Sequence, residues 1–249
     1  MRDGKELVLH VCHLYPDLLN LYGDRGNVLA FIKRCQWRNI NVCLHRVELG
    51  QSVDFKQFDF LFIGGGSDRE QHILAQDLAK KVSSLAAALE EGLVTLAICG
   101  GYQLLGKYYQ TVQGKKIPGL GIMDIYTVAG EERLIGNVLL ECLVDGVPGQ
   151  LVGFENHAGR TFLGEGVQPL GRVSEGYGNN GQDGYEGAVW RNVYCSYLHG
   201  PLLPKNYKLT DHLISLALAR RGVNLELTPL DNSLEEAAVQ VMVQRLLKK

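Results

Sequence analysis

The apolar and polar residues in the first half of the chain form two alternating kinds of segment. Continuous apolar runs rich in β-branched and aromatic residues are typical of buried parallel strands. Segments with apolar residues three and four positions apart are typical of helices that cover such strands. Strands are predicted at 7–13, 41–47, 58–63 and 94–98, and helices at 27–38, 67–91 and 102–108. This βαβα alternation predicts a mostly parallel sheet with helices on both faces.

The second half of the chain has a different pattern. Its strand-like runs lie closer together, which favours antiparallel additions or an extension of the sheet. These runs are 122–128, 134–143, 151–154 and 188–197. Two further helices are predicted, one that ends before Gly222 and one that begins at Ser233 with Glu236 in capping-box position. Because no repeat or linker interrupts the pattern, we predict a single domain over 1–249.

The composition is that of an ordinary globular protein. Hydrophobic residues make up 46% of the 249 positions and charged residues 21%. A net charge of −2 gives no electrostatic signature for binding nucleic acid or an anionic membrane. No apolar stretch reaches the length that spans a bilayer, and the first residues lack a signal-peptide core, so we expect a cytoplasmic protein.

The six cysteines are then expected to be reduced thiols. They form no Cys-x-x-Cys pair and have no zinc-type spacing with the seven histidines, so the sequence predicts no metal site. Most of the histidines, His10 and His45 among them, lie in ordinary strand or helix contexts, and structural roles are predicted for them.

Cys99 is the strongest candidate nucleophile. It follows the apolar run 94–98 and precedes the pair Gly100-Gly101, which predicts a sharp turn from a strand into a helix. The free N–H groups of a helix N-terminus stabilise a thiolate and can hold a developing oxyanion. A buried structural cysteine is the alternative, but it gives the two glycines no purpose.

Two histidines are candidates for the base that serves this thiol. His199 ends an apolar strand and is followed by Gly-Pro, and His157 lies at a similar strand end. Because the carboxyl ends of parallel strands meet in one crevice, a histidine there can reach Cys99. Imidazole is a suitable base for a thiol. His199 is the preferred candidate, although taken alone it is equally well explained as a strand cap.

Two glycine-rich segments offer further candidates. Gly64-Gly65-Gly66 follows the strand 58–63, where it forms either a plain tight turn or a second N–H donor to an oxyanion. Gly101-x-x-x-x-Gly106-Lys107 nearly spells a phosphate-binding loop. Tyr108 stands where that motif needs Ser or Thr to bind magnesium, so no ATP site is expected on this chain.

Several motifs together resemble the class I glutamine amidotransferases, in the branch that includes the glutaminase domains of cobyric acid synthases. They are Ile98-Cys-Gly-Gly-Tyr-Gln103, Gly64-Gly-Gly66 and Tyr197-Leu-His-Gly-Pro201. The segments 18–27, 62–70, 152–161 and 198–207 are similar, more narrowly, to the glutaminase subunits of lipid II isoglutaminyl synthase. The resemblance extends over nearly the whole chain and implies a three-layer α/β/α, flavodoxin-like fold.

The resemblance implies a site that hydrolyses L-glutamine. Cys99 would attack the side-chain amide, and His199 would take the thiol proton and then protonate the departing ammonia. The backbone N–H of Gly100, with those of Gly65 and Gly66, would hold the oxyanion.

Two residues are implied as substrate contacts. Arg133 matches the family position that binds the α-carboxylate of glutamine, a task that suits a guanidinium. Gln103 lies in the motif that follows the nucleophile. No metal or cofactor is implied on this chain.

The implied partner is a Mur-ligase-like subunit of the MurT type. It would use ATP and magnesium to activate D-isoglutamate in the lipid II stem peptide, and ammonia from this chain would convert that group to isoglutamine. The complex would act in the cytoplasm at the inner face of the membrane. The alternatives are a cysteine hydrolase acting on another γ-glutamyl compound, an amidotransferase that feeds a different synthetase, and a non-catalytic binding module.

The sequence departs from the family pattern at one position. Many class I amidotransferases carry a glutamate two residues after the histidine, and here that residue is Pro201. Either a Cys–His dyad suffices or the acid comes from elsewhere. The resemblance suggests an aspartate of the partner subunit, and Glu155 is an internal candidate.

Overall fold

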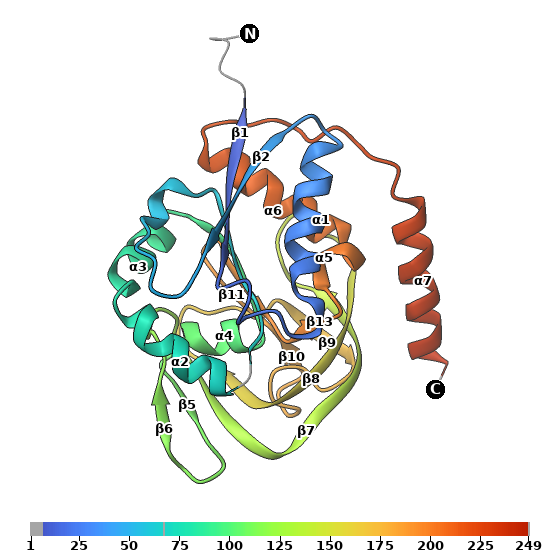
Figure 1. Cartoon of the computed structure of the whole chain (residues 1–249). Helices are drawn as coiled ribbons and strands as arrows, with labels where there is room; N and C mark the ends of the chain where they lie inside the picture. The colour runs from blue at the N-terminus through green and yellow to red at the C-terminus, as the bar shows by residue number, and fades with distance from the viewer. Residues whose placement is uncertain (1–6, 67, 249) are drawn as a thin grey trace.

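The computed structural model describes residues 7–66 and 68–248. The first of two sheets has six strands: β1 (Val8–Leu14), β2 (Asn41–Val47), β3 (Phe60–Ile63), β4 (Val94–Ile98), β11 (Ala188–Trp190) and β12 (Val193–Ser196). Their order is β11-β12-β4-β3-β1-β2 (Figure 1). All neighbours are parallel except the edge strand β11. The carboxyl ends of β3, β4 and β12 therefore lie side by side.

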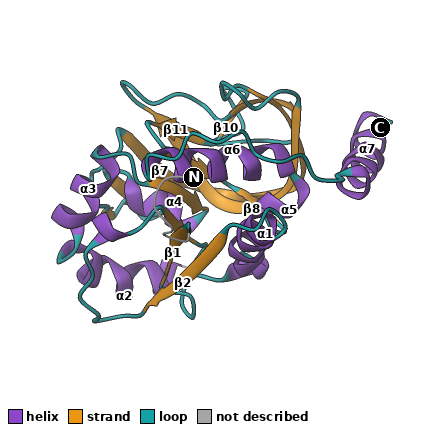
Figure 2. Ribbon diagram, turned by 90° about the horizontal axis from the view of Figure 1, so that it is seen from above, coloured by secondary structure: helices purple, strands orange, loops and turns teal. Residues whose placement is uncertain are grey.

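Helices cover both faces of this sheet. The helices of the chain are α1 (Arg25–Gln36), α2 (Asp68–Ala79), α3 (Val82–Glu90), α4 (Gly100–Leu105), α5 (Leu202–Lys205), α6 (Tyr207–Arg220) and α7 (Ser233–Leu247), with short 3₁₀ turns η1 (Leu21–Gly23) and η2 (Phe55–Gln57). Of these, α7 packs against β7 and β8, outside the first sheet. In both views α2 and α3 lie on one side of β1 and β2, and α1 and α5 lie on the other (Figures 1 and 2). The predicted three-layer α/β/α arrangement is confirmed.

Of the runs predicted as antiparallel additions or a sheet extension, 188–197 extends the first sheet as β11 and β12, and the other three lie in a second sheet. It contains β5 (Tyr108–Gln110), β6 (Lys116–Pro118), β7 (Ile125–Cys142), β8 (Gln150–Leu163), β9 (Gly171–Glu175), β10 (Tyr185–Glu186) and β13 (Leu198–His199). β7 and β8 form a long antiparallel hairpin whose register shifts between Ala129 and Leu134. β13 follows β12 by one residue and pairs with β8, so the chain passes from the first sheet to the second just before His199.

Three predicted elements differ from the observed ones. The helix predicted over 67–91 is two helices, α2 and α3, and the break falls beside Lys81, which pairs with the buried Asp77. The helix predicted to reach Tyr108 ends at Leu105, because Gly106 takes an extended conformation. The strand predicted over 188–197 is folded into the hairpin β11–β12 by a turn at Arg191, whose φ is 53°.

Capping boxes were predicted at the starts of two helices, α2 and α7. Ser67, the proposed cap of α2, lies outside the described residues. At α7 the cap is Asn232 rather than Ser233, and no side-chain capping bond forms. The Glu236 carboxylate instead accepts a 2.6 Å hydrogen bond from the Tyr207 hydroxyl, so tertiary contact has displaced the capping box.

One continuous core of buried side chains includes members of both sheets. The rings of Phe31 in α1 and Phe60 in β3 stack with centroids 4.1 Å apart, and Val138 and Leu140 of β7 belong to the same core. This packing fixes the second sheet against the carboxyl ends of the first. No helix in the described part of the chain is both long enough and apolar enough to cross a bilayer.

Candidate active site

Cys99 lies on the predicted turn between β4 and α4. Its φ of 50° and ψ of −104° are unusual for a residue with a side chain, and such strain persists only where the surroundings impose it. The Cys99 N–H donates to the Ser196 carbonyl of β12 at 2.8 Å, and its carbonyl accepts from Gln103 N–H at 3.0 Å. The side chain is only 8% exposed. The sheet and the helix together therefore hold the thiol in a sheltered position.

His199 is fully buried beside this turn. Its Nδ1 lies 3.2 Å from Oδ1 of Asp24, and Nε2 has no hydrogen-bond partner among the described residues. Burial lowers the pKa of His199, but the hydrogen bond with Asp24 and the nearby Asp24 and Cys99 groups outweigh it and raise the pKa to about 10. The imidazole is therefore cationic at neutral pH, with Nε2 as the ring nitrogen left for chemistry.

Asp24 is the acid that sequence reasoning missed. It is fully buried between η1 and α1, where Oδ1 faces His199 and Oδ2 accepts the Gly65 N–H at 2.8 Å. A buried carboxylate needs such partners. The position of Asp24 in the chain could have suggested this role. Asp24 follows the carboxyl end of β1, and β1 lies beside β3, which ends at the Gly64–Gly66 turn. The positions considered for this acid from the sequence were the one two residues after His199, Glu155 and an aspartate of the partner, but not Asp24.

Gly65 occupies the centre of this group. A Cβ on Gly65 would lie 3.0 Å from Asp24 Oδ2, 3.2 Å from His199 Cε1 and 3.4 Å from Cys99 Cβ. Only glycine permits so close an approach. The Gly65 N–H, predicted for the oxyanion, already donates to Asp24.

The other predicted oxyanion donors are differently placed. Gly100 is the first residue of α4, and the first N–H groups of a helix have no acceptor within it. It adjoins Cys99 and is suitably placed for an oxyanion. The role predicted for Gly66 stays a prediction.

The rival base, His157, is committed elsewhere. Its ring stacks on Tyr197 with centroids 3.7 Å apart, and its nitrogens contact Gly159 O at 2.7 Å and Glu155 Oε2 at 3.4 Å. Glu155 in turn accepts the N–H groups of Tyr177 and Gly178. The structure thus pairs His199 with Asp24 and leaves Glu155 to His157 and the loop after β9.

Gln103 lies in α4, one turn after Cys99. Its amide donates to the Tyr197 hydroxyl at 3.0 Å, and that hydroxyl lies 2.6 Å from Oγ1 of Thr161. This buried network fixes the Gln103 side chain close to the nucleophile turn.

Arg133 lies at the shifted register of the β7–β8 hairpin, and it is exposed. Its Nε and Nη2 each donate to Asn156 at 2.7 Å, to the side-chain and backbone oxygens respectively. Asn156 donates to the Tyr22 hydroxyl at 2.8 Å, and the Tyr22 ring meets the His199 ring edge-on at 4.8 Å. Arg133 is therefore linked to His199 through Asn156 and Tyr22. Its Nη1 takes part in neither of the two hydrogen bonds to Asn156.

The near phosphate-loop motif forms no phosphate cradle. Gly101 lies inside α4, and the Lys107 ammonium pairs with Asp124 at 2.5 Å. The segment is therefore a helix start followed by an ion-paired lysine rather than a loop of free N–H groups.

Comparison with known proteins decides the family. Residues 10–207 match the model of the CobB/CobQ-like glutamine amidotransferase domain. The chain belongs to this family. It is 44% identical, over 95% of its length and 96% of the relative's, to the subunit GatD of the glutamine-hydrolysing lipid II isoglutaminyl synthase of Staphylococcus aureus strain N315. It is 40% identical to the protein of the same name from Streptococcus pneumoniae strain R6, over 92% of this chain and 88% of that one.

More distant similarities are to a cobyric acid synthase and to solved structures of glutamine amidotransferases. A cobyric acid synthase from Pelotomaculum thermopropionicum is 32% identical over 67% of this chain and 34% of its own length. A crystal structure of a glutamine amidotransferase matches with a TM-score of 0.56 and 21% identity, covering 83% of this chain and 98% of that one. A Thermotoga maritima glutamine amidotransferase matches with a TM-score of 0.52 and 14% identity, covering 97% and 99%. The solved structures confirm the fold, and the family confirms the prediction of a glutamine-hydrolysing enzyme.

Proposed function

We propose that this chain is the glutaminase subunit of a lipid II isoglutaminyl synthase. The relatives that carry this name are similar over nearly the whole chain, which supports the proposal. The observation that carries the chemistry is the buried arrangement of Cys99, His199 and Asp24 around Gly65.

In the first half of the reaction, His199 takes the proton of the Cys99 thiol, the thiolate sulfur attacks the side-chain amide carbon of L-glutamine, and the carbonyl oxygen becomes an oxyanion. The N–H of Gly100 stabilises that charge. The raised pKa of His199 favours the protonated ring, which delivers the thiol's proton from Nε2 to the amide nitrogen, so ammonia leaves and a thioester remains.

In the second half, His199 is neutral because it has given its proton to ammonia. It can now accept a proton from water, whose oxygen attacks the thioester carbon. Collapse of the second oxyanion releases glutamate and regenerates the Cys99 sulfur and the protonated imidazole. Asp24 keeps Nε2 directed at the reacting atoms by holding Nδ1, so it acts as a positioning residue.

The substrate is oriented by groups outside this trio. Arg133 would bind the α-carboxylate of glutamine, since Asn156 fixes its plane and Nη1 is not used in that contact. Gln103 would contact the substrate from α4, with Tyr197 fixing its amide. Both roles are part of the proposal.

The ammonia would pass to a partner of the Mur-ligase-like MurT type. That subunit would bind ATP and magnesium and present the activated carboxylate of the lipid II stem peptide, so this chain needs no cofactor of its own. The complex would work in the cytoplasm beside the membrane that holds lipid II.

Reconstitution of the two chains with lipid II, ATP and magnesium tests the proposal. With glutamine as nitrogen source we expect amidation only when both chains are present, and with ammonium chloride the Mur-ligase-like chain should suffice. Cys99→Ala should abolish the first reaction and spare the second. Release of glutamate from another γ-glutamyl compound in preference to glutamine would favour the alternative hydrolase. Absence of any glutaminase activity in the presence of the partner would favour a binding module.

A further inference from the structure

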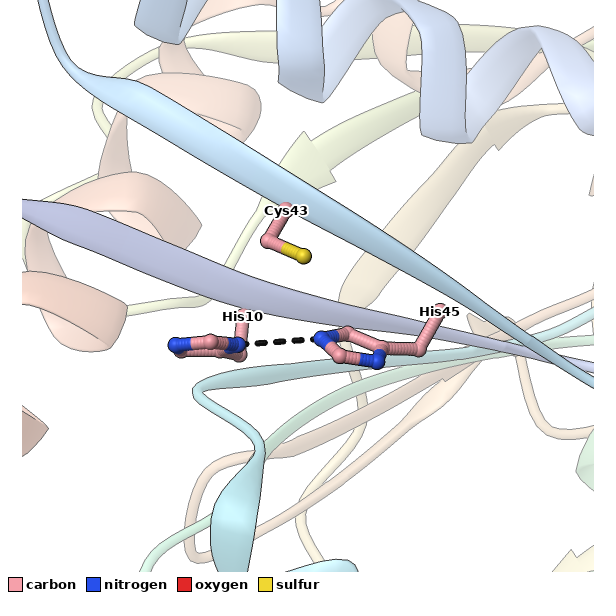
Figure 3. Close-up of side chains that lie close together, drawn as sticks. All are labelled: His10, Cys43 and His45. Carbon is pink, nitrogen blue, oxygen red and sulfur yellow. Dashed lines mark hydrogen bonds between the residues drawn. The ribbon is translucent and has the colours of Figure 1, made fainter.

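Three potential metal ligands lie on one face of the first sheet, at its β2 edge (Figure 3). The parallel register places His10 of β1 opposite Cys43 of β2, and His45 follows Cys43 by two residues on the same face. His10 and His45 are partly buried, and Cys43 is exposed. This group lies nearer the amino end of β1, whereas the candidate active site lies at the carboxyl ends of the strands.

The distances between the ligand atoms are close to those of a zinc site. His10 Nδ1 lies 2.9 Å from His45 Nε2, and the ligand atoms of all three residues lie within 4.8 Å of one another. A tetrahedral ion with Zn–N of about 2.0 Å and Zn–S of about 2.3 Å separates its ligand atoms by roughly 3.3–3.7 Å. Side-chain rotations alone can supply so small an adjustment at an edge strand.

The two ring nitrogens point at one another and share a single proton in the present arrangement (Figure 3). A metal ion between them replaces that proton. The donor imidazole shifts its proton to its far nitrogen, so both rings stay neutral, and the Cys43 thiol releases its proton to solvent. Two neutral imidazoles and one thiolate form a donor set that zinc prefers.

The surroundings hold His10 in place. Its backbone N–H donates to Asp59 at 2.7 Å, and Asp59 also pairs with Arg221 at 3.0 Å. Asp59 is buried and does not belong to the group of ligand atoms that lie within 4.8 Å of one another.

We propose that His10, Cys43 and His45 form a zinc site in which water fills the fourth position and the ion ties the edge strand β2 to β1. The spacing rules that predicted no metal site do not detect it, because His10 and His45 are 35 positions apart and only the strand register joins them.

The test is a Co²⁺ and Zn²⁺ titration of the full chain after tag removal and chelation. The Cys99→Ala background removes the thiol of the candidate active site, which lies beside His199. We expect one equivalent of Co²⁺ with the visible absorption of a tetrahedral site and a thiolate charge-transfer band, both displaced by Zn²⁺. Cys43→Ser should abolish the charge-transfer band, and His45→Ala should weaken Zn²⁺ binding at least about 100-fold. Cys142→Ser, which changes a thiol away from this group, should leave the titration unchanged.

Two further measurements do not depend on how the variants fold. In the wild-type chain, Zn²⁺ should slow the alkylation of Cys43, followed residue by residue by mass spectrometry, and should raise the midpoint of thermal unfolding. Glutaminase activity of Cys43→Ser should match that of the wild type. The proposal is overturned if Zn²⁺ fails to protect Cys43, or if tight binding survives Cys43→Ser and disappears with Cys99→Ala.

Discussion

Asp24 and His199 are 175 positions apart in the chain, yet Oδ1 of the one lies 3.2 Å from Nδ1 of the other. Both side chains are fully buried. The acid that contacts the imidazole here comes from the turn before α1, and not from the position two residues after the histidine, which is Pro201. The expectation of an acid from the partner subunit or from Glu155 is not needed to orient His199.

Asp24→Asn should lower kcat while leaving KM for glutamine nearly unchanged. The loss is expected to be about 10²–10⁴-fold, because an imidazole without its carboxylate takes the wrong tautomer. Steady-state glutaminase assays with and without the Mur-ligase-like partner measure it. Asp17→Asn is the control, since Asp17 is exposed and pairs with Arg46. Full activity of Asp24→Asn in the complex would assign the orienting acid to the partner.

The pH dependence of stability should report the same contact. The pKa of His199 is raised in the fold from 6.5 to about 10, so folding favours the protonated ring. The resulting stabilisation is complete below about pH 6.5 and is lost as the pH rises through about 10. The difference in unfolding free energy between wild type and Asp24→Asn should therefore shrink across this range. Urea unfolding at several pH values measures the difference, and a constant value would contradict the assigned pKa.

A glutamine-analogue electrophile should label Cys99 and, with it, abolish glutamine hydrolysis. Burial raises the pKa of four other thiols and makes them poor nucleophiles: Cys12, Cys35, Cys142 and Cys195. Cys43 is exposed and serves as the internal control, because iodoacetamide should reach it whereas the analogue should not. Mass spectrometry that finds the analogue on Cys43 in preference to Cys99 would remove Cys99 from its proposed role.

Gly65→Ala should reduce glutaminase activity by about 10²-fold, because the new methyl group presses on His199 and Cys99 and displaces them. Gly136→Ala is the matched control, since a Cβ there meets nothing within 4 Å. Circular dichroism and thermal unfolding should show both variants folded. Equal activity of the two variants would mean that the crowding at Gly65 has no catalytic consequence.

Arg133→Ala should raise KM for glutamine through loss of a charged hydrogen-bond pair, on the order of 2 kcal/mol or roughly 30-fold. Analogues without an α-carboxylate should bind the wild type poorly and should be insensitive to the substitution. Arg172→Ala, on an exposed position of β9, is the control. If wild type and variant discriminate these analogues equally, another group binds the carboxylate.

The sequence by itself determined the alternation of strands and helices, the turn at Cys99 and the position of His199 at a strand end. These features are local, because strand periodicity, a Gly-Gly pair and a helix start are encoded within a few neighbouring residues. The motifs around them were also sufficient to identify the family.

The tertiary structure alone decided which polar groups meet. It brought Asp24 to His199, gave the Gly65 N–H to a carboxylate, stacked His157 on Tyr197 and set His10 opposite Cys43. Strand order and register arise from packing between segments that are far apart in the chain. A local pattern therefore shows that a residue is polar and at a strand end, but it does not show which buried partner it will face.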